Sequence, residues 1–357
     1  MSLRSMRFVL GALALALAGS AAAQTQIKFI LNWKYYGPQA WFFVAQDKGY
    51  FKAEGLEVAF DQGDGSPGAP TKVAAGIYDA GFGDLPTVIQ LAAQRPVEAP
   101  IGVYMMYSNP PYVIATKKSS GIVKPKDLEG KTIGGPANDG ALRLWPAFSK
   151  IAGIDTSKVK VENMAANLRE QMLNRGQIDA AFGFIQTIWF SAKAIGIDPA
   201  KELHFIRYAD HGLPLYSNSL VVSKKLAREN PDAVKGMVRA INRAFHEVRA
   251  NPEMGMDAVM KREPLLKRQV EKERLLQTIE YEVMSSEMKS IGIGDVDEAR
   301  LKKGIDLLVE SLKLPRTPST STGVCAGAGS FSAKSAAVVT STRAWPDGSS
   351  TSSSYRK

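Results

Sequence analysis

The feature that most constrains the fold is an eight-residue pattern that occurs twice in the chain. Residues 76–83 read GIYDAGFG, and residues 176–183 read GQIDAAFG. Each copy follows a helical pattern, contains a short apolar run suited to a buried strand, and leads into another helical pattern. The repeat therefore predicts two similar lobes built from strands and helices. We interpret its aspartates, Asp79 and Asp179, as structural.

Strands and helices alternate in the same order on both sides of the repeat. In the first half we expect strands at 27–31 and 56–60, with a helix between them that starts at Pro38. The order begins again near residue 131. A strand after each helix favours right-handed crossovers and a mainly parallel sheet, which places ligands at the carboxyl ends of the strands. Further helices fit residues 230–248, 264–288 and 296–312.

A second pair of similar segments predicts where the chain passes between the lobes. YSNPPYVI begins at residue 107, and YSNSLVV begins at residue 216. We expect the chain to leave the first lobe near residue 108 and to return near 215, so that the second lobe is an insertion in the first. The predicted division is a signal peptide at 1–23, lobe one at 24–108 and 216–314, lobe two at 109–215, and a tail at 315–357.

The two ends of the chain differ from its body. Arg4 and Arg7 precede an apolar run that ends in small residues up to Ala23. This run is too short to span a bilayer and has the pattern of a secretory signal peptide. Serine and threonine are dense beyond Leu314 and no periodicity persists, which predicts a disordered tail or the product of a shifted reading frame.

Charge and cysteine content exclude several classes of function. The formal net charge is +10, but the signal peptide and the tail carry more than half of it. The body is therefore only mildly basic, which argues against a nucleic-acid partner. The single cysteine, Cys325, lies in the tail, so neither an intramolecular disulfide nor a cysteine metal site is expected.

The body of the chain carries no catalytic motif. The three histidines are scattered, and neither a Gly-x-Ser-x-Gly elbow nor a phosphate-binding Gly-x-x-x-x-Gly-Lys loop occurs. We therefore expect a binding protein with no cofactor and no metal, rather than an enzyme.

Two kinds of segment are candidates for a ligand site. The turn Asn32-Trp33-Lys34-Tyr35-Tyr36 places flat aromatic rings at the end of a strand, where they suit a ring-bearing ligand, although such rings also pack in cores. Asp84 lies at a helix start after the first copy, where it can accept from a ligand amino group or cap the helix. The same two interpretations apply to segment 138–140. Segment 183–186 is the second-lobe counterpart of the turn at Asp84, and its Gln186 can donate and accept from one amide.

With these motifs placed, the chain resembles the periplasmic substrate-binding proteins of ABC importers, in the group for nitrate, sulfonates, taurine and thiamine pyrimidine precursors. The resemblance covers about residues 26–312. It is carried by LNW at 31–33, FVAQDKGYFKAEGLEV at 43–58, the first repeat copy, and LEGKTIG at 128–134. It implies the type II fold, two α/β lobes that close on a ligand, and delivery to a permease and ATPase in the inner membrane by a monomeric periplasmic receptor.

The Asn-Trp pair looks most like the thiamine-precursor branch, whose cleft holds an aminopyrimidine-type ring. The ligand-binding residues implied by the resemblance are Asn32, Trp33, Tyr36, Asp84, Thr87, Asn138, Asp139, Phe184 and Gln186. Family members that act as pyrimidine synthases use a cysteine cluster and a histidine, and this chain lacks the cluster.

Three alternatives stay open at this point. The first is a receptor for a small anion such as a sulfonate, taurine or nitrate, for which Lys34 and Arg143 are the nearest cations. The others are an enzyme of pyrimidine synthesis on the same fold and a ligand-sensing partner of a signalling receptor.

Overall fold

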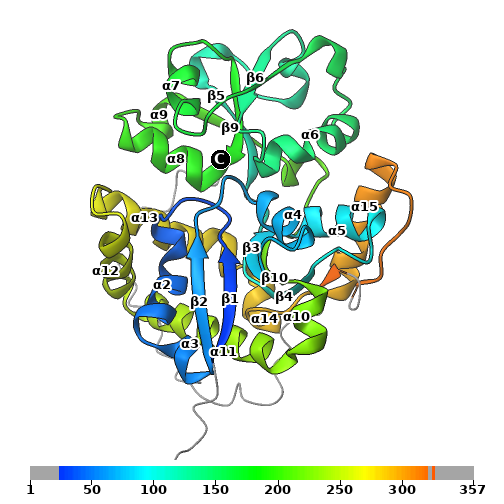
Figure 1. The fold of residues 1–357 in the computed structure, drawn as a ribbon. Helices are drawn as coiled ribbons and strands as arrows, with labels where there is room; N and C mark the ends of the chain where they lie inside the picture. Colours follow the sequence, from blue (N-terminus) through cyan, green and yellow to red (C-terminus); the bar gives the residue numbers. More distant parts are fainter. Residues whose placement is uncertain (1–23, 321–323, 326–357) are drawn as a thin grey trace, which may run out of the picture.

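Each lobe in the computed structural model is built around a five-stranded sheet (Figure 1). The structure describes residues 24–320, 324 and 325. The expected signal peptide and residues 326–357 of the expected tail lie outside the described residues. Within the described part of the chain, no helix is long and apolar enough to cross a membrane.

The sheet of lobe one has the order β2-β1-β3-β10-β4. Three of its strands, β1, β2 and β3, pair in parallel, whereas β10 is antiparallel to both β3 and β4. The strands are β1 (Thr25–Ile30), β2 (Leu56–Asp61), β3 (Ala80–Asp84), β4 (Ile101–Met105) and β10 (Asn218–Val222).

The sheet of lobe two repeats this plan with the order β7-β6-β8-β5-β9. Here β5 is the antiparallel strand, between β8 and β9. The strands are β5 (Tyr112–Lys117), β6 (Thr132–Gly135), β7 (Lys160–Asn163), β8 (Ala180–Phe184) and β9 (Leu203–Arg207). The prediction of two mainly parallel sheets is confirmed, with one antiparallel strand in each. Both antiparallel strands enter from the other lobe, so they start at the edge where the parallel strands end.

Helices flank both sheets. Lobe one carries η1 (Gly37–Gln39), α2 (Ala40–Asp47), α3 (Tyr50–Ala53), α4 (Gly68–Ala74), α5 (Leu85–Gln94), α10 (Lys224–Glu229), α11 (Pro231–Ala250), α12 (Pro252–Arg262), α13 (Arg268–Thr278), the π-helix η6 (Ile279–Val283), α14 (Ser286–Ile291) and α15 (Glu298–Leu312). The helix expected over 264–288 is interrupted, because the Ser285 side chain accepts from the Met288 amide and begins α14 anew.

Lobe two carries shorter helices. They are η2 (Lys118–Ser120), η3 (Pro125–Leu128), α6 (Gly140–Ile151), η4 (Thr156–Lys158), α7 (Arg169–Asn174), α8 (Ile185–Ala194), α9 (Pro199–Glu202) and η5 (Ala209–His211). In Figure 1, α13 of lobe one lies beside α8 on one side of the interlobe boundary, and α15 lies beside α6 on the other.

The core of lobe one forms where α11 packs on α2. The apolar stripe of α11, with Met237, Ile241 and Phe245 at steps of four, is fully buried, as its spacing predicts. On α2, Trp41 meets Phe245 edge to face at 5.6 Å between ring centroids. This rigid base holds the carboxyl ends of β1, β2 and β3 in place.

The two aspartates of the repeat have the same structural role. Asp79 accepts from the backbone amide of Lys28 at 2.8 Å, which fastens the approach to β3 onto β1. Asp179 accepts from the amide of Thr132 at 2.8 Å, which fastens the approach to β8 onto β6. Their interpretation as structural residues is confirmed.

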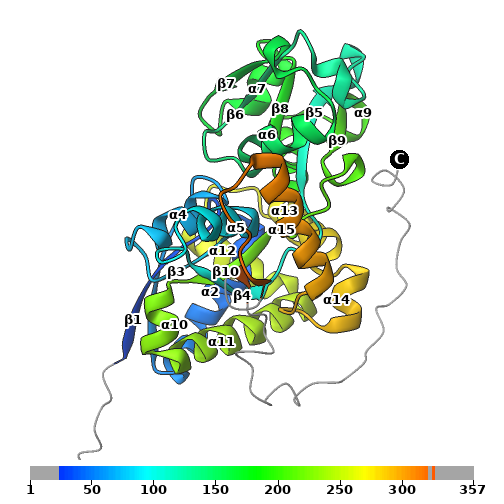
Figure 2. The same ribbon diagram turned by 90° about the vertical axis from the view of Figure 1, so that its right-hand side faces the viewer.

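Two segments cross between the lobes, residues 106–111 and residues 208–217, and both are fastened to the C-terminal helices. The Arg300 guanidinium on α15 donates to the Ser108 carbonyl at 2.6 Å and to the Leu215 carbonyl at 3.4 Å. Asn109 donates from its side chain to the Tyr281 carbonyl at 2.6 Å. Figure 2 shows α15 running alongside the lobe-one helix α5 toward lobe two.

Part of the expected tail belongs to the folded body. Val324 and Cys325 are buried, and Cys325 forms a parallel bridge with Gly102 of β4. The expectation of disorder for 315–357 therefore does not hold for these two residues. The physical reason is that β4 is an edge strand with unpaired backbone groups, which an apolar pair can cover.

Candidate functional site

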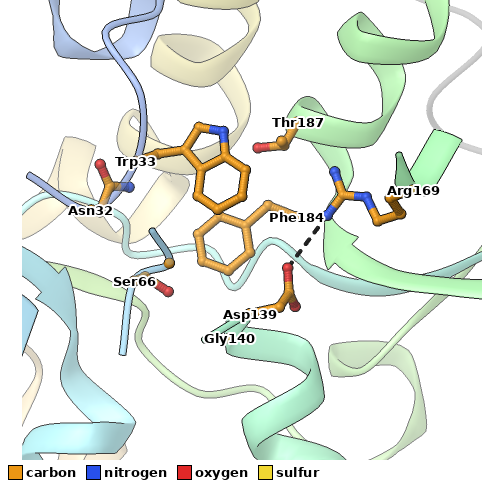
Figure 3. Close-up of a pocket in the computed structure, with 9 residues that line it drawn as sticks. Asn32, Trp33, Ser66, Asp139, Gly140, Arg169, Phe184 and Thr187 are labelled. Atoms are coloured by element: carbon orange, nitrogen blue, oxygen red, sulfur yellow. Dashed lines mark hydrogen bonds and ion pairs between the residues drawn. The ribbon is translucent and has the colours of Figure 1, made fainter. Parts of the chain in front are cut away.

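A hollow lies between the lobes at the carboxyl ends of the strands, where the sequence predicts it (Figure 3). The free space between its walls is about 300 Å³ when the open solvent at its mouth is counted. Loops after β1 and β2 supply its lobe-one wall, and the starts of α6, α7 and α8 supply its lobe-two wall. The lining residues are Asn32, Trp33, Gly65, Ser66, Asp139, Gly140, Arg169, Phe184 and Thr187.

Aromatic rings from opposite lobes meet at this hollow. Figure 3 shows the Trp33 indole and the Phe184 ring directed into the same space, with the Thr187 hydroxyl beside them. The Phe184 ring is held by an edge-to-face contact with Tyr112, at 5.3 Å between centroids. Such a pair can enclose a flat ligand from two sides when the lobes are closed.

Asn32 is the polar neighbour of Trp33 and is nearly buried. The side-chain amide of Gln39 donates to Asn32 Oδ1 at 2.9 Å, which fixes the orientation of the Asn32 amide. Its Nδ2 group is therefore the end that can donate to an acceptor on a ligand.

Asp139 and Arg169 form the charged part of the lobe-two wall. The carboxylate of Asp139 caps α6 by accepting from the Ala141 amide at 2.8 Å, and it also contacts Arg169 at 3.4 Å. Burial raises the pKa of Asp139, although Arg169 and the amide bonds oppose this shift. The capping role that the sequence left open is thus present at a residue that also lines the hollow.

Arg169 is fully buried, and protein groups already occupy its guanidinium. It donates to Glu170 Oε1 from Nε at 3.0 Å and from Nη2 at 2.6 Å, and Nη1 donates to the Phe182 carbonyl at 3.1 Å. Burial acts to lower the pKa of Arg169, but Glu170 and Asp139 together raise it above its ordinary value. Arg169 therefore orders this wall and has little capacity left for an anion.

The loops of the two lobes touch at the mouth of the hollow. A Cβ atom added to Gly65, which has φ +149°, would lie 1.7 Å from the Asn138 carbonyl oxygen of the other lobe. Asn138 Nδ2 donates to Asp64 at 3.0 Å across the same boundary. A Cβ atom added to Gly140 of lobe two would lie 2.9 Å from Ser66 Oγ of lobe one. The lobes are thus closed on each other in this structure.

Asp84 and Thr87 do not line the hollow. The buried Asp84 carboxylate accepts from the Thr87 hydroxyl at 2.8 Å and from the Tyr112 hydroxyl of lobe two. Burial raises the pKa of Asp84 to about 6, and the two hydroxyl donors only partly offset this effect. This pair fastens β3 to the first strand of lobe two.

Three other predicted residues also lie outside the hollow. The Arg274 guanidinium lies over the Tyr36 ring, with its Cζ atom 4.3 Å from the ring centroid. Asn138 is partly exposed and bonds to Asp64 and Arg143. Gln186 is buried on α8. The structure therefore brings together Asn32, Trp33, Asp139 and Phe184 from the predicted set.

The sequence interpretation missed five lining residues. Thr187 had a signal, because it stands at the place of Thr87 in the second copy. Gly65 and Ser66 lie in a loop rich in glycine, and Gly140 follows the predicted Asn138-Asp139 pair. Arg169 had no local signal. Among the described residues, no group of three or more His, Cys, Asp or Glu is placed to hold a metal ion.

Comparison with known proteins identifies the family. A family model described as NMT1/THI5 like matches residues 39–254, more than half of the chain. The chain belongs to this family. A similar protein, 26% identical over 235 residues, is the 4-amino-5-hydroxymethyl-2-methylpyrimidine phosphate synthase of Schizosaccharomyces pombe. The match covers 64% of this chain and 66% of that relative.

A second relative of this chain is named as a binding protein. The riboflavin-binding protein RibY of Chloroflexus aurantiacus is 27% identical over 222 residues, which cover 60% of each chain. The chain thus spans about two thirds or less of the length of these two relatives.

A solved structure supports the architecture. The alkanesulfonate-binding protein SsuA from Xanthomonas axonopodis pv. citri bound to MOPS superposes with a TM-score of 0.63 at 15% identity. The superposition covers 83% of this chain and 96% of that one. This likeness confirms the two-lobed fold of periplasmic binding proteins.

Proposed function

We propose that this protein is a periplasmic solute receptor that binds a pyrimidine-type thiamine precursor between its lobes and delivers it to an ABC importer. The observation that carries the proposal is the pairing of Trp33 from lobe one with Phe184 from lobe two at one hollow. A planar ring between them contacts both lobes only when these are closed. The ligand therefore favours the closed state, which is the form that docks on the permease and ATPase.

The rest of the hollow fits an aminopyrimidine. Asn32 Nδ2 can donate to a ring nitrogen, and the buried Ser66 hydroxyl, which has no partner, can donate or accept. The names of the relatives, a pyrimidine phosphate synthase and a riboflavin-binding protein, support a heteroaromatic ligand.

Export to the periplasm is part of the same proposal. The pattern of residues 1–23 supports it, as does the fold, which is that of periplasmic receptors. We expect the receptor to act as a monomer.

A small-anion receptor is the second candidate, because the SsuA structure is that of an alkanesulfonate-binding protein. The state of Arg169 argues against a free anion in the hollow, since Glu170, Asp139 and the Phe182 carbonyl already occupy its donors. A pyrimidine synthase is the third candidate, given the fission yeast relative. None of the nine lining residues is a histidine or a cysteine, which favours binding over catalysis.

Calorimetry on the purified protein tests these candidates against one another. We expect 4-amino-5-hydroxymethyl-2-methylpyrimidine to bind and to quench tryptophan fluorescence, and taurine and nitrate not to bind. Trp33→Leu should remove most of the quenching, whereas Trp145→Phe, in the lobe-two core, should leave it unchanged. Binding of taurine or nitrate without any binding of the pyrimidine would overturn the proposal. Turnover detected by mass spectrometry would favour the synthase.

A further inference from the structure

We propose that the ligand cleft continues from the hollow along the seam between α8 and α13, where Arg274 and Gln186 bind an anionic group of the ligand. The inference rests on the proposed receptor function and extends it to the chemistry of the ligand. A pyrimidine that carries a phosphate, carboxylate or sulfonate would fill both parts of the cleft.

The seam joins the two lobes. Lys193 of α8 pairs with Glu273 of α13, and Lys267 donates to the Ala194 carbonyl at 2.9 Å. The Arg274 guanidinium lies 5.7 Å from the centre of the Phe190 ring. These contacts place the two helices side by side, as Figure 1 shows. Gln186 precedes Phe190 by four residues and therefore lies on the same face of α8.

Buried polar atoms without partners concentrate at this seam. Arg274 is 3% exposed, and Nη2 bonds to Glu271 at 3.1 Å, but Nε and Nη1 have no partner. Gln186 is also 3% exposed, and neither atom of its amide has a partner. Because buried donors and acceptors in folded proteins are nearly always bonded, such a group of atoms from both lobes points to a polar group that arrives from outside the chain.

Tyr36 and Gln186 connect the seam to the hollow. The Tyr36 ring lies under the Arg274 guanidinium at 4.3 Å, and its phenol is also within electrostatic reach of Arg169, which lines the hollow. Gln186 directly precedes Thr187, another lining residue. Both residues are predicted ligand contacts that the hollow itself leaves out, and the seam gives them that role.

The unused donors specify the class of group. The Nε and Nη1 atoms of Arg274 carry three N–H bonds without a protein acceptor, on different edges of the planar guanidinium fork, and the oxygens of a phosphate, carboxylate or sulfonate can accept from them. Glu271 keeps the fork in place, because it also accepts from the Gly37 amide at 2.8 Å. The Gln186 amide can donate to a third oxygen or accept from a protonated one.

Two probes that differ only by a phosphate group test the inference. They are 4-amino-5-hydroxymethyl-2-methylpyrimidine and its phosphate ester, titrated by calorimetry into the full exported chain. We expect the phosphate to bind about 10- to 100-fold more tightly than the alcohol, the factor typical of bonds to a buried charge. Arg274→Gln should reduce this ratio to about one.

Arg268→Gln is the matched control, because Arg268 lies on the same helix and is partly exposed, with its guanidinium paired to Glu253 and Asp257. It should keep the full ratio. Circular dichroism shows whether Arg274→Gln folds. If it does not, the double variant Glu271→Gln/Arg274→Gln replaces it, because this variant leaves no unpaired buried carboxylate. Gln186→Leu tests the contribution of lobe two and should reduce the affinity ratio several-fold.

The outcomes separate the two proposals. Equal affinity of the unaltered protein for both probes would overturn the anionic subsite and leave the receptor function standing. A folded Arg274 variant that keeps the full preference for the phosphate would also overturn it. Failure of both probes to bind would overturn the proposed function, and this inference with it.

Discussion

The helices that follow the two copies of the repeat start from the same backbone hydrogen-bond pattern, but their first side chains have different roles. Asp84 is paired in register with Asn218, and Phe184 is paired in the same way with Tyr112. The next amide also bonds alike, Leu85 to the Ser217 carbonyl and Ile185 to the Pro111 carbonyl, both at 2.9 Å. The frame around the two helix starts is therefore duplicated.

The side chains at these starts differ. In the first copy, Asp84 and Thr87 bond to each other and are buried. In the second copy, Phe184 and Thr187 line the hollow. Tyr112 stands between the two, since it donates to Asp84 and supports the ring of Phe184. The duplicated backbone therefore fixes the positions of these side chains. Their neighbours from the other lobe determine whether they stabilise the fold or line the hollow.

The largest expected effect concerns stability at the first copy. Because burial raises the pKa of Asp84 from its ordinary 3.8 to about 6, the folded state holds a proton that the unfolded chain releases between these pH values. The free energy of unfolding should therefore fall as the pH rises from 4 to 7, by about 3 kcal/mol from this group. Asp84→Asn stays neutral and should lose this part of the fall, measured by urea unfolding. An identical decline in the variant would contradict this account.

The next effect concerns binding at the second copy. Phe184→Ala removes one face of the aromatic pair and should weaken pyrimidine binding about 10- to 100-fold, or about 1.4 to 2.7 kcal/mol. Its effect on stability should be smaller, because the ring is only partly buried. Calorimetry and thermal unfolding of the same preparation measure both effects. Unchanged affinity would contradict a ligand-binding role for Phe184.

The two threonines give a matched pair of smaller effects. Thr87→Val removes a hydroxyl donor from the buried Asp84 carboxylate and should lower the free energy of unfolding by about 1 to 2 kcal/mol without changing affinity. Thr187→Val should leave stability within about 0.5 kcal/mol and weaken ligand binding a few-fold. The assignment of roles would be wrong if the two variants exchanged these results.

The smallest effects test what the copies share. Asp79→Ala and Asp179→Ala each remove one bond to a strand amide and should each lower the free energy of unfolding by about 0.5 to 1.5 kcal/mol. The two losses should add in the double variant, because the sites lie in different lobes. Denaturant unfolding of the three variants measures this, and a loss confined to one aspartate would show that the copies are not equivalent.

The sequence was sufficient to predict the frame because the repeat and the alternation of strands and helices are local patterns. Trp33 and Phe184, which the sequence singled out, both line the hollow, because Trp33 lies in the turn after β1 and Phe184 is the last residue of β8. The sequence could not decide the role of Asp84, because the direction of its carboxylate depends on Tyr112, which belongs to the other lobe. The order of strands in each sheet depends on non-local pairing and has no counterpart in a periodic pattern.

Arg169 of the hollow and Arg274 of the proposed anionic subsite were the hardest residues to predict. Arg169 and Arg274 lie on helices whose patterns indicate only packing against a core or solvent. Arg169 is held within lobe two by Glu170, Asp139 and the Phe182 carbonyl. The environment of Arg274 exists only when the lobes meet, because Arg274 of lobe one faces Phe190 of lobe two. No local rule of spacing can reveal such a contact between two lobes.

The hydrogen atom that Gly65 has in place of a side chain sets how closely the two lobes approach each other at this point. A methyl group there would collide with the Asn138 carbonyl, so a larger residue would oppose closure without removing any side chain that contacts a ligand. Each 1.4 kcal/mol of such opposition would reduce the closed population, and with it the apparent affinity, by about tenfold. In the proposed receptor, the size of the residue at position 65 would therefore set the balance between open and closed states without changing the groups that recognise the ligand.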